Sequence, residues 1–209
     1  MIRRFIWLGL LALAAWWWLS APDPVSHELE LPFDAPVRFD SRLAIDRPPL
    51  QSAVPAHVTA LPIGEFRLTP VAEFEIEARV LGRKDYRRGV EARLSPLDLA
   101  LGWGPMARPE VLEAIRIRQS RRFYYWSTDR FPIPRRDIER NSANMHLIPA
   151  GGDIARDLDR IRAGQNVRLG GYLVNVDRDD GWRWRTSLTR DDTGAGACEI
   201  VLVTRVQLP

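Results

Sequence analysis

The N-terminal stretch is the feature that most constrains how this chain can fold. Residues 5–21 (FIWLGLLALAAWWWLSA) carry no charge, follow Arg3 and Arg4, and end at Pro22. As a helix this segment would be about 26 Å long, against a bilayer hydrocarbon core of about 30 Å. Because arginines favour the cytoplasmic side, we expect a single pass through the cytoplasmic (inner) membrane with the N-terminus inside. Everything after residue 21 would then lie in the extracytoplasmic space, which is the periplasm in a Gram-negative cell.

A cleaved signal peptide is the alternative interpretation of residues 1–21. It would share the basic start, the apolar centre and an imperfect small-residue end at Leu19-Ser20-Ala21. Two features favour an uncleaved transmembrane anchor. Pro22 would directly follow the cleavage site, and Trp16-Trp17-Trp18 is typical of an aromatic belt at a membrane interface.

Residues 22–65 are predicted to form a proline-rich, extended tether. Eight of the sixteen prolines lie between residues 22 and 62, and each proline fixes φ and removes a backbone donor. The tether should therefore contain neither a helix nor a central strand. Its short apolar alternations, such as Leu29 and Leu31, could lie along the domain as edge pieces.

Residues 66–209 are predicted to form one extracytoplasmic domain of the mainly β (α+β) class. Three segments should be strands, because they alternate or are almost wholly apolar: 72–81, 167–176 and 199–206. A capping signal and helical spacing predict short helices at 95–100 and 153–162. Bent strands with glycine at the bends suggest a small, partly closed β-barrel of the OB or SH3-like kind, with one or two short helices.

Composition excludes several classes of function. A single cysteine rules out an internal disulfide and a multi-cysteine zinc site, and three scattered histidines argue against a histidine-built metal centre. The formal net charge is only +3, which is weak evidence for a nucleic-acid partner. We therefore expect no metal, no cofactor and no nucleic acid.

One pair of residues could build a thiol nucleophile with its base, namely Cys198 and His146. The spacing of Cys198 from Ile200 and Leu202 on the last strand favours a buried position on the core side instead. His146 is interpreted as a hydrogen-bonded histidine in a structural loop. The protein is therefore interpreted as non-catalytic. A cysteine-dependent hydrolase or transpeptidase acting on envelope material is the alternative.

The last strand resembles the sortase transpeptidases, in which a nucleophilic cysteine follows an apolar strand and a threonine. This resemblance implies Cys198, His146 and Arg205 as catalytic residues. The sequence departs from the pattern at the nucleophile itself, because Arg205 follows the run Leu202-Val203-Thr204 and Cys198 lies at the other end of the strand.

Three segments together resemble a family of uncharacterised bacterial membrane-anchored proteins. They are SPLDLALGWG (95–104), SANMHLIPA (142–150) and SLTRDDTGAGACE (187–199). The similarity covers residues 66–204. It implies a membrane address and no assigned activity.

Arginine and aromatic side chains gather in RIRQSRRFYYW (116–126), and residues 116–140 hold eight arginines against three acidic residues. Such a surface can bind anions. We predict a binding or assembly module of the cell envelope, whose partner is an envelope protein or an anionic envelope polymer or lipid. A structural subunit of an envelope complex is a second alternative. The candidate lining of the binding groove is Trp103, Gln119, Arg122, Tyr125, Trp126, Asn144, His146 and Arg190.

Overall fold

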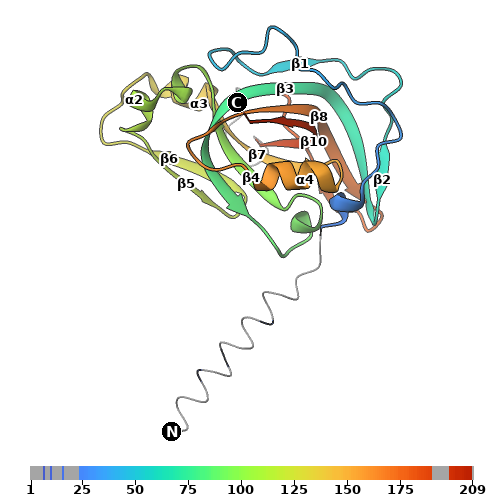
Figure 1. Ribbon diagram of the computed structural model, residues 1–209. Coiled ribbons are helices and arrows are strands. Elements are labelled where there is room, and N and C mark those ends of the chain that lie inside the picture. Colours follow the sequence, from blue (N-terminus) through green and yellow to red (C-terminus); the bar gives the residue numbers. More distant parts are fainter. Residues whose placement is uncertain (1–6, 8–9, 11–15, 17–23, 190–197, 209) are drawn as a thin grey trace.

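The computed structural model describes residues 24–189 and 198–208, together with Trp7, Leu10 and Trp16. Strands are the main regular secondary structure in this part of the chain (Figure 1), which confirms the mainly β prediction. Across the described residues, no helix is both long and apolar enough to cross a bilayer. Apart from the three N-terminal residues named above, the predicted anchor at 5–21 lies outside the described residues.

One large mixed sheet forms the centre of the domain. Five of its strands pair in a ring, in which β3 pairs with β4, β4 with β7, β7 with β10, β10 with β8, and β8 with β3 again. The β7–β10 pairing is parallel and the other four are antiparallel. The five strands are β3 (Phe66–Asp85), β4 (Leu97–Gly102), β7 (Ser142–Pro149), β8 (Asn166–Arg178) and β10 (Glu199–Gln207). Three short strands extend the sheet: β1 (Leu50–Ser52), β2 (Leu61–Ile63) and β9 (Arg183–Trp184).

The glycines of β8, where the sequence suggests a bend, lie opposite an irregularity in β10. A Cβ atom at Gly171 would lie 1.9 Å from the carbonyl oxygen of Leu202, so only glycine allows β8 to approach β10 this closely. The register of the two strands shifts between Val203 and Arg205, opposite Gly171 and Gly170. An irregularity of this kind increases the local bend and twist of a sheet, which closure of the five-strand ring requires.

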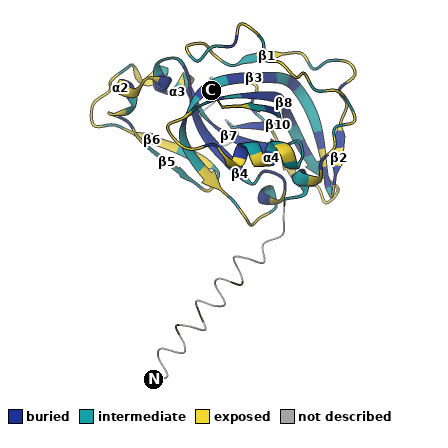
Figure 2. Cartoon of the chain, in the orientation of Figure 1, coloured by how far each residue is buried: buried dark blue, intermediate teal, exposed yellow. Residues whose placement is uncertain are grey.

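Both faces of the sheet carry buried apolar residues, and the central strands are largely coloured as buried in Figure 2. The inner face carries Phe74, Ile76 and Leu99, and the helix α4 (Gly152–Asp159) adds Leu158 to this cluster. The other face is covered in part by the segment predicted as a tether. That segment begins with the short 3-10 helix η1 (Val25–Glu28) and buries several apolar side chains against the sheet: Leu29, Val58, Leu61 and Ile63.

Three short α-helices occur among the described residues, whereas one or two were predicted: α2 (Pro109–Leu112), α3 (Arg135–Arg140) and α4. The helix predicted at 153–162 is confirmed as α4, whereas the helix predicted at 95–100 is wrong because this segment contains β4. Every residue of β4 is buried. Its pairing with a strand on each side therefore outweighs the local capping signal of Ser95 and Pro96.

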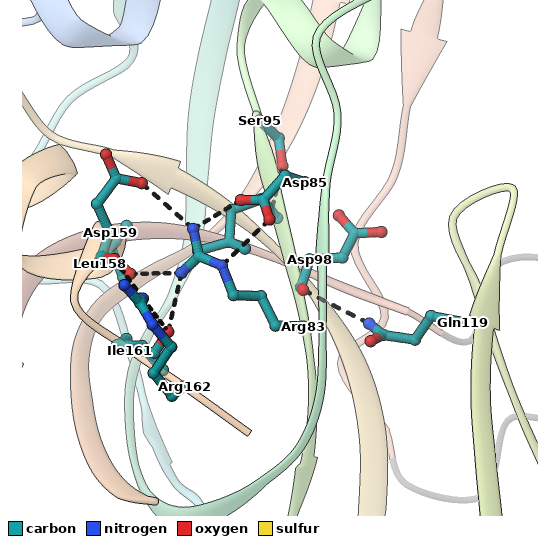
Figure 3. Close-up of polar contacts among 10 residues, drawn as sticks. Arg83, Asp85, Ser95, Asp98, Gln119, Leu158, Asp159, Ile161 and Arg162 are labelled. Atoms are coloured by element: carbon teal, nitrogen blue, oxygen red, sulfur yellow. Dashed lines mark hydrogen bonds and ion pairs between the residues drawn. The ribbon is translucent and has the colours of Figure 1, made fainter. Parts of the chain in front are cut away.

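Arg83 fastens α4 to the end of β3 (Figure 3). Its guanidinium donates to the carbonyl oxygens of Leu158 at 2.7 Å and Ile161 at 3.2 Å. The same group pairs with Asp85 at 2.6 Å and Asp159 at 3.2 Å. A cation at the C-terminal end of a helix satisfies carbonyls that have no partner within the helix.

Candidate binding surface

A separate two-stranded sheet projects from the ring between β4 and β7. It consists of β5 (Arg116–Ser120) and β6 (Phe123–Ser127), at the left of Figure 1. Ser120 pairs with Phe123, which leaves Arg121 and Arg122 as a two-residue turn with φ angles of 52° and 68°. Turns of this kind usually hold Asn-Gly or Gly-Gly, because other residues lose about 1–2 kcal/mol each in the left-handed region. Interactions elsewhere must therefore hold this turn in place.

Arg122 supplies those interactions from both its side chain and its backbone. The guanidinium donates to Asp98 Oδ1 at 2.7 Å and lies 3.8 Å above the ring of Tyr86. The Arg122 backbone N–H donates to the Tyr86 hydroxyl at 3.0 Å, and its carbonyl accepts from Asn144 Nδ2 at 3.1 Å. Arg122 therefore attaches the tip of the hairpin to β4 and β7. We call Arg122 and its partners Tyr86, Asp98 and Asn144 the latch.

Asp98 is the centre of this latch and is fully buried in β4. Asn144 Nδ2 donates to its second carboxylate oxygen at 3.2 Å. His146 Nδ1 lies 2.9 Å from Oδ1, although the angle is not that of a hydrogen bond. Gln119 of β5 donates to Asn144 Oδ1 at 2.8 Å and points toward the Asp98 carbonyl, 3.5 Å away (Figure 3). A buried carboxylate needs such partners, because an isolated buried charge is strongly unfavourable.

The low polarity around the latch shifts the ionisation of neighbouring groups. Burial, followed by the nearby charge of Asp98, raises the pKa of the Tyr86 hydroxyl. The same two causes raise the pKa of Cys198 to about 11, although a hydrogen bond with Asn144 lowers it slightly. The Cys198 thiol points at the Arg122 carbonyl oxygen, 3.9 Å away. At neutral pH this thiol is protonated, which is the less nucleophilic form.

The two faces of the hairpin have opposite roles. On the inner face, Ile117 and Trp126 pack against a small apolar cluster that includes Ile138 of α3. On the outer face, Arg118 pairs with Tyr125 across the two strands, with the guanidinium 5.5 Å from the ring. Phe123 lies on the same outer face, since it is two residues from Tyr125.

Exposed aromatic side chains are concentrated here. From Pro24 onward, three described aromatic residues are more than one third exposed: Phe123 at 37%, Tyr125 at 46% and Phe131 at 52%. All three lie in β6 or in the loop that follows it. Exposed aromatic groups next to arginines are typical of binding surfaces.

Four of the predicted lining residues meet at the latch: Gln119, Arg122, Asn144 and His146. Tyr125 lies on the outer face of the hairpin, and Trp126 lies on the inner face. Trp103 is buried in the main core and lines no surface. Arg190 lies outside the described residues.

The third residue of the proposed catalytic set, Arg205, is placed at a different site. It is buried, donates to the Pro36 carbonyl oxygen at 2.6 Å and forms an ion pair with Glu75. Among the described contacts, no hydrogen bond joins Cys198 to His146. The described part of the chain also has no group of three or more His, Cys, Asp or Glu side chains arranged to hold a metal ion.

From the sequence, Asp98 was one of the residues that could carry chemistry but had no assigned role, and Tyr86 and Trp184 were not candidates. Asp98 is the one charge in the apolar strand LDLALG, and a lone acid within such a run was the available signal. Tyr86 and Trp184 gave no comparable signal, because their contacts with Arg122 and with the His146 ring join segments far apart in the sequence. In the comparisons with known proteins, no family model, no curated protein and no solved structure matches this chain.

Proposed function

We propose that this protein is a non-catalytic binding and assembly module of the cell envelope, held at the membrane by residues 5–21. The outer face of the β5–β6 hairpin is its binding surface. The observation that carries the proposal is the concentration of exposed aromatic side chains, Phe123, Tyr125 and Phe131, within one short stretch. The sequence of residues 5–21 supports the membrane address.

The buried latch supports a binding role for the outer face. A hairpin with only two strands has little stability of its own. Here the pairing of Arg122 with Asp98 fixes the tip of the hairpin, and Gln119 fixes one strand of it. A surface that is already rigid loses less conformational freedom on binding than a mobile loop does.

The ring of strand pairings supports the finer proposal that the domain is a small, partly closed β-barrel of the OB type. Five strands pair in a closed order, and the glycines of β8 provide the bend that closure needs. In such a scaffold the hairpin is an addition between β4 and β7 rather than part of the barrel wall. The addition has its own exposed face, which is consistent with a role separate from the core.

The chemistry of Cys198 favours binding over catalysis. Burial and the charge of Asp98 raise its pKa to about 11, whereas thiol nucleophiles in enzymes have a lowered pKa. Its hydrogen-bond acceptor is the backbone of Arg122 rather than a general base. These features support a structural role for this cysteine.

The proposal is tested by capture of envelope components with the intact, membrane-anchored chain after cross-linking in cells. The test variant is Phe123→Ser with Tyr125→Ser, which removes the two exposed rings of β6 but leaves the latch. The control is Val37→Ser, because Val37 is 89% exposed and lies on the segment before β1. We expect one set of captured components to be lost with the hairpin variant and kept with the control. Equal capture by all three proteins would refute the proposal.

A further inference from the structure

The outer edge of β6 has backbone groups with no partner. In a two-residue hairpin the pair next to the turn, Ser120 and Phe123, exchanges hydrogen bonds, and such pairs then alternate along the strands. The N–H and C=O groups of Tyr124 and Trp126 therefore point away from β5. Among the described residues, no hydrogen bond reaches these groups. An open strand edge is a template for adding another strand.

A groove of about 440 Å³ runs along this edge. Residues 124–128 form one side of it, and Phe131, Arg135 and Glu139 form the other. Five strand residues span about 16 Å, which is the length of a short extended peptide. The exposed ring of Phe131 provides an apolar wall against which side chains of such a peptide could pack.

The surroundings of the groove are positively charged. Several ion pairs are already made within the hairpin region, including Arg116 with Asp129 and Arg135 with Glu139. Three exposed arginines beside the groove form no ion pair with any other described residue. Arg118 lies against the ring of Tyr125, and Arg130 and Arg136 are the sequence neighbours of the lining residues Phe131 and Arg135. This excess of positive charge favours a partner that carries carboxylates.

From these features we infer that the groove binds an extended, acidic peptide segment of a partner protein, which adds a strand to the edge of β6. The peptide backbone would exchange hydrogen bonds with Tyr124 and Trp126, and its acidic side chains would face the unpaired arginines. The inference rests on the proposed binding function and names its partner class. Lipid headgroups and anionic polymers offer negative charge but no peptide N–H groups. Probes that differ only in their peptide N–H groups therefore distinguish a bound peptide from a bound lipid or polymer.

The test uses the full chain in detergent and measures the Kd of labelled peptides by fluorescence anisotropy. The probe is a capped nonapeptide in which glutamate alternates with valine, and its control has lysine in place of glutamate. Two further probes carry N-methyl groups on one or the other alternate set of residues. Because alternate N–H groups of a strand point to opposite sides, one methylated set should weaken binding by about tenfold or more, and the other set by less than about threefold.

The position of the site is tested with two variants that add the same charge. Phe131→Glu places a carboxylate in the groove wall and should weaken binding of the glutamate probe by about tenfold. Val37→Glu places it on an exposed residue outside the groove lining and should have little effect. Both variants change exposed side chains, so their folding should match that of the unmodified chain.

Three outcomes would overturn the inference: no binding of any peptide, equal effects of the two methylated sets, or equal effects of the two variants. Binding of anionic lipid vesicles that matches the glutamate probe, with no effect of methylation, would assign the surface to an electrostatic lipid or polymer site instead. The proposed function stands even if the peptide inference fails, provided that the Phe123 and Tyr125 double variant loses captured envelope components. If capture does not depend on that face, both proposals fail.

Discussion

Removal of the Arg122 side chain is the most direct test of the latch. In Arg122→Ala, the fully buried Asp98 loses the guanidinium that lies 2.7 Å from its Oδ1. The Arg122 side chain is itself only 16% exposed, so solvent screens the pair weakly. Breaking a buried ion pair by removing one partner costs about 3–5 kcal/mol, because the remaining charge has no compensation. We expect a loss near the lower end, about 3 kcal/mol, since Asn144 still donates to Asp98.

The neighbouring residue provides a matched control. Arg121 lies in the same turn with a φ of 52°, is exposed, and forms no ion pair with a described residue. Arg121→Ala should change the free energy of unfolding by less than about 0.5 kcal/mol. Arg122→Gly should be about 1 kcal/mol more stable than Arg122→Ala, because glycine adopts the left-handed conformation without strain.

The measurement is urea unfolding of the full chain in detergent, followed by tryptophan fluorescence, with hydrogen exchange of residues 116–127 as a local probe. Asp98→Ala combined with Arg122→Ala should cost less than the sum of the single changes, since the double variant buries no lone charge. An Arg122→Ala protein as stable as the Arg121→Ala control, or strict additivity in the double variant, would refute the latch.

Three further predictions concern other parts of the chain. Because burial raises the pKa of Cys198 to about 11 from 9.0, alkylation by iodoacetamide should accelerate only as the pH approaches 11. In the unfolded chain the thiolate forms at a lower pH than in the folded chain, so the free energy of unfolding is retained below pH 9 and declines from pH 9 toward 11. An alkylation midpoint near pH 9 would contradict the raised pKa. Gly171→Ala, whose new Cβ would lie 1.9 Å from the Leu202 carbonyl oxygen, should lower the free energy of unfolding by about 3 kcal/mol. Gly152→Ala, where the nearest atom is 3.5 Å away, serves as its control in the same urea titration, and equal stability of the two variants would disprove the steric reasoning. Glu75→Gln should destabilise the chain by about 3 kcal/mol, because Arg205 is left buried without a carboxylate partner; a Tm unchanged in thermal unfolding would show that the pair is dispensable.

The strands that the sequence predicted are those with a strong local pattern. Alternation over 72–81 and the apolar runs at 167–176 and 199–206 predict β3, β8 and β10, and all three are present. Side-chain alternation has the same period as the strand itself, so the pattern is readable without knowledge of the partner strand. The helix predicted at 95–100 was wrong because its local pattern was misleading. Its local signal was a helix cap, and the pairing of β4 with β3 and β7 was invisible in the sequence.

The candidate site likewise contains residues that the sequence indicated and residues that it did not. Gln119, Arg122, Asn144 and His146 were four of the eight residues predicted to line a binding groove, and these four do meet. Their common centre, Asp98, is marked in the sequence only as a lone acid in an apolar run, and its partner Arg122, 24 positions away, cannot be identified from that local signal. The turn was equally hidden, since Arg121-Arg122 lacks the asparagine or glycine that marks left-handed turns.

By itself, the sequence determined which segments are apolar, where strands repeat with period two, and that the hairpin region is rich in arginine and aromatic residues. Only the tertiary structure decided which of those residues are buried and which are exposed. Local patterns depend on the neighbouring few residues, whereas burial and ion pairing depend on contacts between distant segments. For this reason Arg122 and Arg118, four residues apart in one basic stretch, have opposite roles: Arg122 closes a buried latch and Arg118 stands on the exposed face.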